Sequence, residues 1–153
     1  MEDTSYLTKT RFTEFALEPQ LLKGLADAGF EYCTKIQAQS LPVALAGQDV
    51  AGQAQTGTGK TAGFTLPMMH ILTENAPNKR VRSIRALVLA PTRELAAQVK
   101  ASVDNYGKHL PLKSAVVFGG VKINPQIRQL RDGVDILVAT PGRLLDLCSQ
   151  KYE

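Results

Sequence analysis

Two short apolar runs constrain the fold of this chain more than any other feature of its sequence. The runs "ALVLA" (86–90) and "DILVA" (135–139) have the apolar character of strands that are buried on both faces. Each is followed by a helical segment, which starts after Pro91 in one case and near Pro141 in the other. Strands that alternate with helices imply right-handed crossovers and a parallel sheet. The sequence therefore predicts an α/β fold with helices flanking a parallel sheet.

The other expected elements fit the same alternation. Helices are expected from Pro19 to a stop at Gly29, over 35–47 with a disturbance at Pro42, from about Lys60, and near 125–130. Strands are expected over "DVAGQA" (49–54) and "SAVVFGG" (114–120). Residues 1–11 are interpreted as a flexible leader, and 12–153 as one partial domain.

Composition places the chain among soluble globular proteins. It has 153 residues, of which 44% are hydrophobic and 21% are charged. No apolar run is long enough for a membrane span, so no membrane partner is expected. Cys33 and Cys148 lack metal-ligand spacing, and we interpret them as reduced thiols of a cytoplasmic protein.

Positive charge is concentrated in the middle of the chain. Residues 78–131 contain eleven Lys and Arg against two acidic residues, whereas 1–77 contain five against eight. Such a segment indicates a polyanionic partner or a solvated surface, and charge alone does not choose between them. The cluster Lys79, Arg80, Arg82 and Arg85 precedes a strand and is interpreted as solvated surface.

A glycine-rich loop lies between an expected strand and an expected helix. In "AQTGTGKT" (54–61), Gly57 and Gly59 allow a tight turn that aims N–H groups at phosphate oxygens. Lys60 can reach the β- and γ-phosphates, and the Thr61 hydroxyl can ligate Mg²⁺. The loop predicts nucleotide binding, but it does not choose among kinases, GTPases, transporters and helicases.

Together with its flanking motifs, the chain resembles the DEAD-box family of ATP-dependent RNA helicases, in their bacterial form. The resemblance covers about Phe12 to Leu147. It rests on "GFEYCTKIQ" (29–37) as the Q motif, "AQTGTGKT" as motif I, "PTRELAAQ" (91–98) as motif Ia, "GG" (119–120), and "TPGR" (140–143) as motif Ib. It implies a partial RecA-like P-loop domain that binds ATP, Mg²⁺ and RNA.

The resemblance assigns an adenine site to the Q motif and a phosphate site to the loop. Gln37 can both donate to and accept from the N6/N7 edge of adenine, and Phe12 offers a ring for stacking. Core packing of Phe12 is the alternative. Lys35 stands where proline is common. The implied nucleotide-binding residues are Phe12, Thr34, Gln37, Ala54, Gln55, Thr56, Gly57, Thr58, Gly59, Lys60 and Thr61, with Lys60 and Thr61 also catalytic.

Three further motifs are implied to bind the RNA sugar-phosphate backbone. Each follows an expected strand, and open α/β sheets bind ligands at the carboxyl edge. The residues are Pro91, Thr92, Arg93, Gly119, Gly120, Thr140 and Arg143. Ordinary strand-end loops are the alternative. None of these groups reads base sequence.

A working NTPase needs a carboxylate at the end of an apolar strand, and no run after Thr61 supplies one. The family carries it in a D-E-A-D motif downstream of T-P-G-R, so we expect a fragment whose parent is the helicase and which is itself inactive. Strands without their neighbours predict marginal stability or self-association. The alternatives are a stand-alone, non-catalytic nucleotide- or RNA-binding module and, less consistent with motifs Ia and Ib, a small-molecule kinase.

Overall fold

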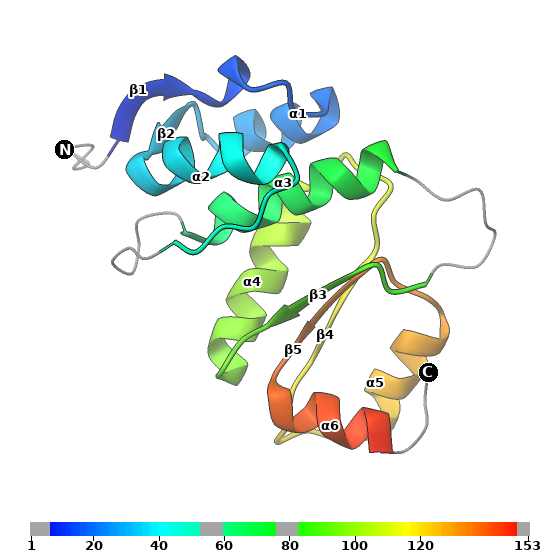
Figure 1. The fold of residues 1–153 in the computed structure, drawn as a ribbon. Helices are drawn as coiled ribbons and strands as arrows, with labels where there is room; N and C mark the ends of the chain where they lie inside the picture. Colours follow the sequence, from blue (N-terminus) through cyan, green and yellow to red (C-terminus); the bar gives the residue numbers. More distant parts are fainter. Residues whose placement is uncertain (1–6, 53–59, 76–82, 150–153) are drawn as a thin grey trace. The chain divides into compact units, whose positions relative to one another are not determined.

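The computed structural model describes residues 7–52, 60–75 and 83–149. The chain divides into two compact units, residues 1–76 with 105–110 and residues 77–104 with 111–153 (Figure 1). Each unit is described by itself.

The second unit is built on a three-stranded parallel sheet. Its strand order is β3 (Ala86–Leu89), β5 (Ile136–Ala139) and β4 (Ser114–Val117). The strands lie in register, with Leu87 and Ala115 both opposite Leu137. All four residues of the central strand β5 are buried, which is the pattern of a parallel strand whose two faces are both covered. The predicted α/β fold and parallel sheet are confirmed.

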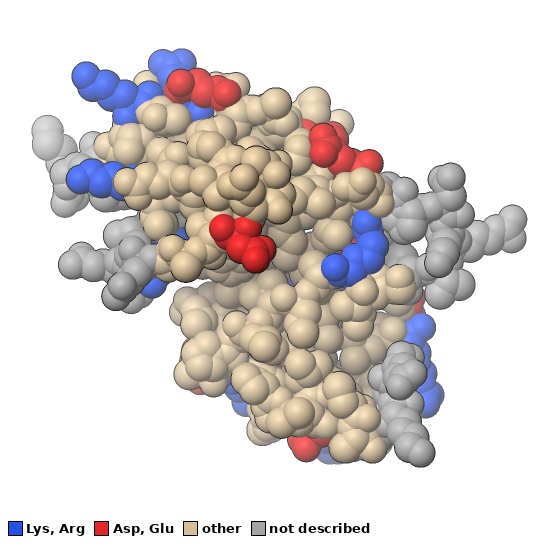
Figure 2. All heavy atoms as spheres, viewed as in Figure 1, with Lys and Arg blue, Asp and Glu red and all other residues tan. Residues whose placement is uncertain are grey.

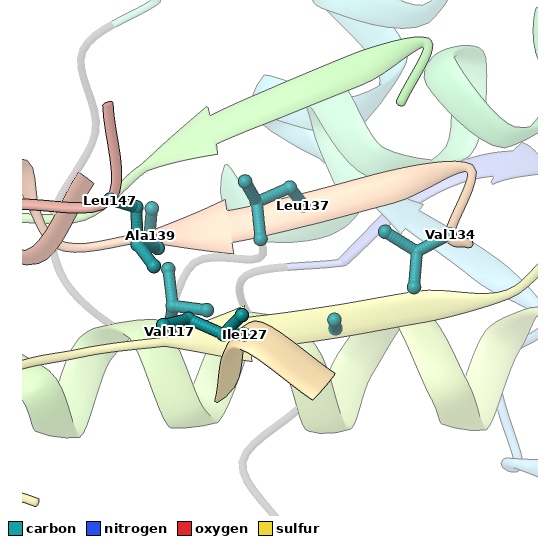
Figure 3. Packing of buried hydrophobic residues seen from close by; sticks show 7 residues of the cluster. Val117, Ile127, Val134, Leu137, Ala139 and Leu147 are labelled. Atoms are coloured by element: carbon teal, nitrogen blue, oxygen red, sulfur yellow. The ribbon is translucent and has the colours of Figure 1, made fainter. Parts of the chain in front are cut away.

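Three helices belong to this unit and begin after its strands. They are α4 (Arg93–Tyr106), α5 (Ile123–Arg131) and α6 (Pro141–Ser149). Ile127 of α5 and Leu147 of α6 pack with Val117, Leu137 and Ala139 of the sheet in one buried cluster (Figure 3). The amphipathic pattern of α5, with Ile123, Ile127 and Leu130 on one side, explains why this helix lies against the sheet.

At the amino ends of the strands, the buried carboxylate of Asp135 joins all three. It accepts hydrogen bonds from the Lys113 N–H at 2.9 Å and from Arg85 Nη2 at 3.3 Å. The backbone carbonyl of Asp135 accepts from the N–H groups of Arg85 and Ala86. Arg85 therefore forms an ion pair and is only 19% exposed in its side chain, so its interpretation as solvated surface was wrong. Lys79, Arg80 and Arg82 lie outside the described residues.

The first unit combines a small antiparallel sheet with helices. Strand β1 (Leu7–Arg11) pairs with β2 (Tyr32–Thr34), and a 3₁₀ turn η1 (Phe12–Glu14) follows β1. The helices are α1 (Pro19–Asp27), α2 (Lys35–Leu45) and α3 (Lys60–Glu74), of which α2 and α3 contact each other. Pro19 starts α1, as predicted, and α2 continues through Pro42 to Leu45 as one helix.

Two expectations for this unit differ from the structure. Residues 7–11, which were assigned to a flexible leader, form β1, because the Thr8 hydroxyl donates to the Cys33 carbonyl and the backbone pairs with β2. The strand expected over 49–54 is not formed in its described part, 49–52, which is exposed. A strand needs a neighbour for its N–H and C=O groups, and no described strand pairs with these residues.

The turn after α4 is tied to the end of α1. Asp27 accepts from His109 Nε2 at 2.5 Å, and Lys108 Nζ lies 3.4 Å from the same carboxylate. The hydrogen bond from His109 lowers the pKa of Asp27, with help from Lys108. Within the described residues, no helix combines the length and the apolar character that crossing a membrane requires.

Gly24 provides a test of packing in the first unit. A Cβ atom built on Gly24 would lie 2.0 Å from the carbonyl oxygen of Tyr106, a backbone atom that cannot rotate away. We expect Gly24→Ala to lower the free energy of unfolding by about 1–3 kcal/mol, because overpacking outweighs the helix propensity of about 1 kcal/mol that alanine contributes. Urea unfolding measures this. Gly142→Ala, where the added Cβ meets nothing within 4 Å, is the control and should not destabilise.

The two cysteines are expected to react differently. Burial raises the pKa of the Cys33 thiol to about 11, with a smaller contribution from Glu14, whereas Cys148 is exposed. A thiol reagent at pH 8 should modify Cys148 rapidly and Cys33 only after denaturation. Rapid labelling of the folded Cys148→Ser variant, in which Cys33 is the remaining cysteine, would contradict the predicted protection of Cys33.

The raised pKa of Cys33 also predicts a dependence of stability on pH. Because the folded pKa of Cys33 exceeds the ordinary value of 9.0, its contribution to stability should persist below pH 9 and decline towards pH 11.

Candidate functional site

The three motifs predicted to bind RNA lie at one edge of the sheet in the second unit. Pro91–Arg93 follow β3, Gly119–Gly120 follow β4, and Thr140–Arg143 follow β5. Parallel strands in register bring these loops to the same carboxyl edge. The Thr140 N–H donates to the Val117 carbonyl at 3.1 Å, which extends the pairing of β5 with β4 into the loop.

Thr92 and Arg93 begin α4 at this edge. The Thr92 Oγ1 accepts a hydrogen bond from the Leu95 N–H at 3.1 Å, so the hydroxyl caps the helix. The Arg93 guanidinium lies over the ring of Phe118, with its central carbon 4.8 Å from the ring centroid. Phe118 directly precedes Gly119, so this cation–π contact joins two of the three motifs.

The two glycines of the loop differ in how strongly the backbone and the surrounding atoms exclude a side chain. Gly120 has φ +84°, which disfavours side chains, and a Cβ there would lie 3.4 Å from Arg93 Nη1. Gly119 has open space around its missing Cβ. Within residues 83–149, no backbone acceptor takes the N–H of either glycine. Exposed N–H groups beside an arginine form an arrangement that favours anions.

Arg143 lies at the same edge, but its guanidinium is directed at protein acceptors. Nη1 donates to Gln126 Oε1 at 2.8 Å, and Nη2 donates to the Val121 carbonyl at 2.8 Å. Its Nε lies 3.9 Å from Asp146 Oδ2, and the side chain is 10% exposed. The free chain therefore uses Arg143 to hold the loop after β4.

Gln126 is a residue at this edge that the sequence reasoning missed. It is buried on α5, and its Nε2 donates to the Phe118 carbonyl at 3.2 Å. A signal was present in the sequence. Gln126 is a polar residue within the apolar stripe that Ile123, Ile127 and Leu130 form, and a polar side chain on a buried stripe needs hydrogen-bond partners.

The Q-motif residues lie in the first unit, at the start of α2. Thr34 and Gln37 form a capping box, in which Gln37 Oε1 accepts from the Thr34 N–H at 2.9 Å and Thr34 Oγ1 accepts from the Gln37 N–H. Both residues are buried. The cap fixes the orientation of the Gln37 amide.

Phe12 is 2% exposed, and its N–H donates to the Glu31 carbonyl. Its ring is therefore used for core packing, which the sequence left as the alternative to stacking on adenine. An adenine can stack on this ring only if the surrounding structure opens.

Two residues of the phosphate loop are described. Lys60 is exposed and Thr61 is partly buried, and they form the first turn of α3, where the helix dipole favours anions. The Thr61 carbonyl accepts from Thr65 Oγ1 at 2.8 Å. This placement suits an ammonium group on a phosphate and a hydroxyl on Mg²⁺. Ala54, Gln55, Thr56, Gly57, Thr58 and Gly59 lie outside the described residues.

One other group in the first unit has the composition of a metal site. Ligand atoms of Glu18, His70 and Glu74 lie within 4.8 Å of one another. However, His70 Nδ1 accepts from the Glu18 N–H at 3.0 Å, so Nε2 carries the proton of the neutral ring and faces Glu74 at 3.2 Å. Both ring nitrogens have partners, so the group is hydrogen-bonded and connects the residue before α1 to the end of α3.

The described residues of the basic middle segment do not all present unpaired charge. Three of its described cations are paired with acids: Arg85 with Asp135, Lys100 with Asp104, and Lys108 with Asp27. On the face shown in Figure 2, Lys and Arg side chains stand in small separate groups among uncharged atoms.

Comparisons with known proteins agree with these motifs. The DEAD/DEAH box helicase family model matches residues 34–153. ATP-dependent RNA helicase RhlB of Idiomarina loihiensis is 50% identical over 146 residues, which cover 95% of this chain and 34% of that protein. RhlB of Xanthomonas axonopodis pv. citri is 49% identical over 146 residues, covering 94% of this chain and 26% of that protein.

Solved structures give the same result. A DEAD box protein from Methanococcus jannaschii superimposes with a TM-score of 0.83 and 37% identity, covering 94% of this chain and 38% of that one. A hypothetical ATP-dependent RNA helicase from Sulfolobus tokodaii has a TM-score of 0.78 and 34% identity, covering 90% and 38%. The chain belongs to the DEAD/DEAH box helicase family. It spans between a quarter and about two fifths of the length of these relatives.

Proposed function

We propose that this chain is the ATP- and RNA-binding N-terminal part of an ATP-dependent RNA helicase. The observation that carries the proposal is the convergence of three family motifs at the carboxyl edge of the sheet, where Arg93 and the N–H groups of Gly119 and Gly120 gather. Together they offer one cation and several backbone N–H donors. These groups suit a phosphodiester backbone and do not distinguish one base from another. In the whole protein, ATP binding and hydrolysis would drive local unwinding of an RNA duplex.

The nucleotide site combines residues of the first unit. Lys60 and Thr61 hold the β- and γ-phosphates and Mg²⁺, while Gln37, oriented by its cap with Thr34, selects adenine. We further propose that residues 12–153 belong to one RecA-like ATP-binding domain and that the protein acts in the cytoplasm.

A second candidate is a stand-alone, non-catalytic binding module. One observation favours it: each described strand of the parallel sheet runs into uncharged residues, namely Ala90 after β3, Phe118 after β4 and Thr140 after β5. Asp135 lies at the opposite ends of the strands, where it is paired with Arg85. Within the described sheet, no carboxylate is therefore placed to organise Mg²⁺ and the attacking water.

Nucleotide selectivity tests the role of Gln37. We expect this chain to bind ADP more tightly than GDP in the presence of Mg²⁺, because the Gln37 amide matches the N6/N7 edge of adenine and mismatches guanine. Calorimetric titration measures both affinities. Gln37→Glu keeps the oxygen that caps Thr34 but loses the donor, so it should abolish the preference while α2 remains folded. Equal affinities in the unmodified chain would exclude this role.

Hydrolysis by the chain alone tests its proposed inactivity, and hydrolysis after joining it to the rest of a relative separates the two candidates. The 153-residue chain alone should release no phosphate from ATP above background, with or without RNA, because its described strand ends offer no carboxylate. An arginine finger contributed by another domain raises the rate of such reactions by about 10³–10⁵, so a chain tested without that group should hydrolyse ATP more slowly for this reason too. Phosphate release beside a Lys60→Ala control measures this. RNA-stimulated release that is lost in Lys60→Ala would contradict it. Restored activity after joining the chain to the remaining two thirds of a relative would favour the helicase over the module.

A further inference from the structure

The side chains of Gln126 and Arg143 form a buried polar pair beside the glycine loop of the second unit. Gln126 is 8% exposed, and the Arg143 side chain is 10% exposed. Most polar groups buried to this degree make hydrogen bonds that compensate for the lost water, and in this pair Arg143 Nε is the buried atom that has no hydrogen-bond acceptor. The partners of this pair show what it holds in place.

The amide of Gln126 connects two segments through its two ends. Nε2 donates to the Phe118 carbonyl at 3.2 Å, and Oε1 accepts from Arg143 Nη1 at 2.8 Å. Because a donor must face Phe118 and an acceptor must face Arg143, the amide has one possible orientation.

Arg143 completes the connection on the other side of the glycines. Its Nη2 donates to the Val121 carbonyl at 2.8 Å. The pair therefore holds the carbonyl immediately before Gly119 and the carbonyl immediately after Gly120. Phe118 is fixed a second time by the Arg93 guanidinium over its ring.

Two adjacent glycines have the largest backbone freedom of any dipeptide, and binding through their N–H groups loses entropy unless the loop is already ordered. Within the described residues, these N–H groups have no backbone acceptor, so they are available for an external anion. A clamp on both flanking carbonyls would remove most of the loop's freedom before any ligand arrives.

We propose that Gln126 and Arg143 are positioning residues that preorganise the N–H groups of Gly119 and Gly120 for one phosphate of the RNA backbone, and that Arg143 does not itself contact RNA. Arg93 supplies the positive charge at this site. The proposal rests on the RNA-binding part of the proposed function, and it reassigns Arg143 from a phosphate ligand to a support of the loop.

The dependence of RNA affinity on salt distinguishes a ligand from a support. For single strands, each cation that contacts a phosphate contributes about −0.7 to the slope of log K against log salt concentration. Affinity for a short oligouridylate is measured over a range of salt concentrations. Arg93→Ala should weaken binding and reduce the magnitude of the slope by about 0.7.

The positioning variants should weaken binding with the slope unchanged. We expect losses of about tenfold for Gln126→Met, which keeps the volume but removes both hydrogen bonds, and for Arg143→Ala. Arg143→Lys should lose as much as Arg143→Ala, because an ammonium keeps the charge but cannot reach Gln126 and Val121 together. Arg128→Ala, an exposed cation on the same helix, is the matched control and should leave affinity nearly unchanged. If Arg143→Lys retains full affinity while Arg143→Ala reduces the slope by about 0.7, Arg143 binds phosphate directly and the proposal is wrong.

Amide NMR spectra of the chain without RNA test the clamp independently. The N–H signals of Gly119 and Gly120 should shift or broaden in Gln126→Met and Arg143→Lys, and remain in place in Arg128→Ala, while the other signals show that each variant is folded. Unchanged glycine signals in the first two variants would refute the clamp. If the unmodified chain binds no oligouridylate, the RNA-binding proposal fails, whereas the free-state spectra still decide whether the clamp exists.

Discussion

The buried carboxylate of Asp135 fixes the amino ends of all three strands of the parallel sheet. It is 2% exposed and accepts from a backbone N–H of the segment before β4 and from the guanidinium of Arg85 before β3. Burying a charge is unfavourable unless its hydrogen bonds are made, and removing one partner leaves the other uncompensated, at a typical loss of about 3–5 kcal/mol. The network therefore favours the one arrangement in which all three strands start at the same level.

That common start determines the other end of the sheet. Four-residue strands in register finish together, so Ala90, Phe118 and Thr140 come to the same edge. Small residues on the central strand and its neighbour, such as Ala139 and Ala115, are completely buried and let α5 and α6 lie close to this face. The loop geometry at the carboxyl edge is thus a consequence of one ionic network at the amino edge and of packing between them.

The sequence was sufficient for those elements whose pattern is local. The apolar runs at 86–90 and 135–139, Pro19 at the start of α1 and the glycines at helix ends predicted most helices and all three parallel strands. The strand β1 was missed because its sequence "LTKTR" is polar and its partner β2 lies more than twenty residues away. Residues 49–54 have a sequence that predicts a strand, but no described strand pairs with them. A strand depends on its partner more than on its own residues.

Side-chain roles at the candidate site were harder to predict, since they depend on where acceptors lie. Two arginines at the same edge show this difference. Arg93 rests on the flat face of Phe118, an interaction that leaves the N–H groups at the rim of the guanidinium able to bind a ligand.

Arg143 instead donates through Nη1 to the Gln126 amide and through Nη2 to the Val121 carbonyl, and a guanidinium with these two hydrogen bonds and little exposure gains less from a phosphate than it loses by leaving them. Neither acceptor is near Arg143 in the sequence. A motif identifies the residues that gather at an edge, whereas the direction of each donor decides which of them meets the ligand and which holds the others in place.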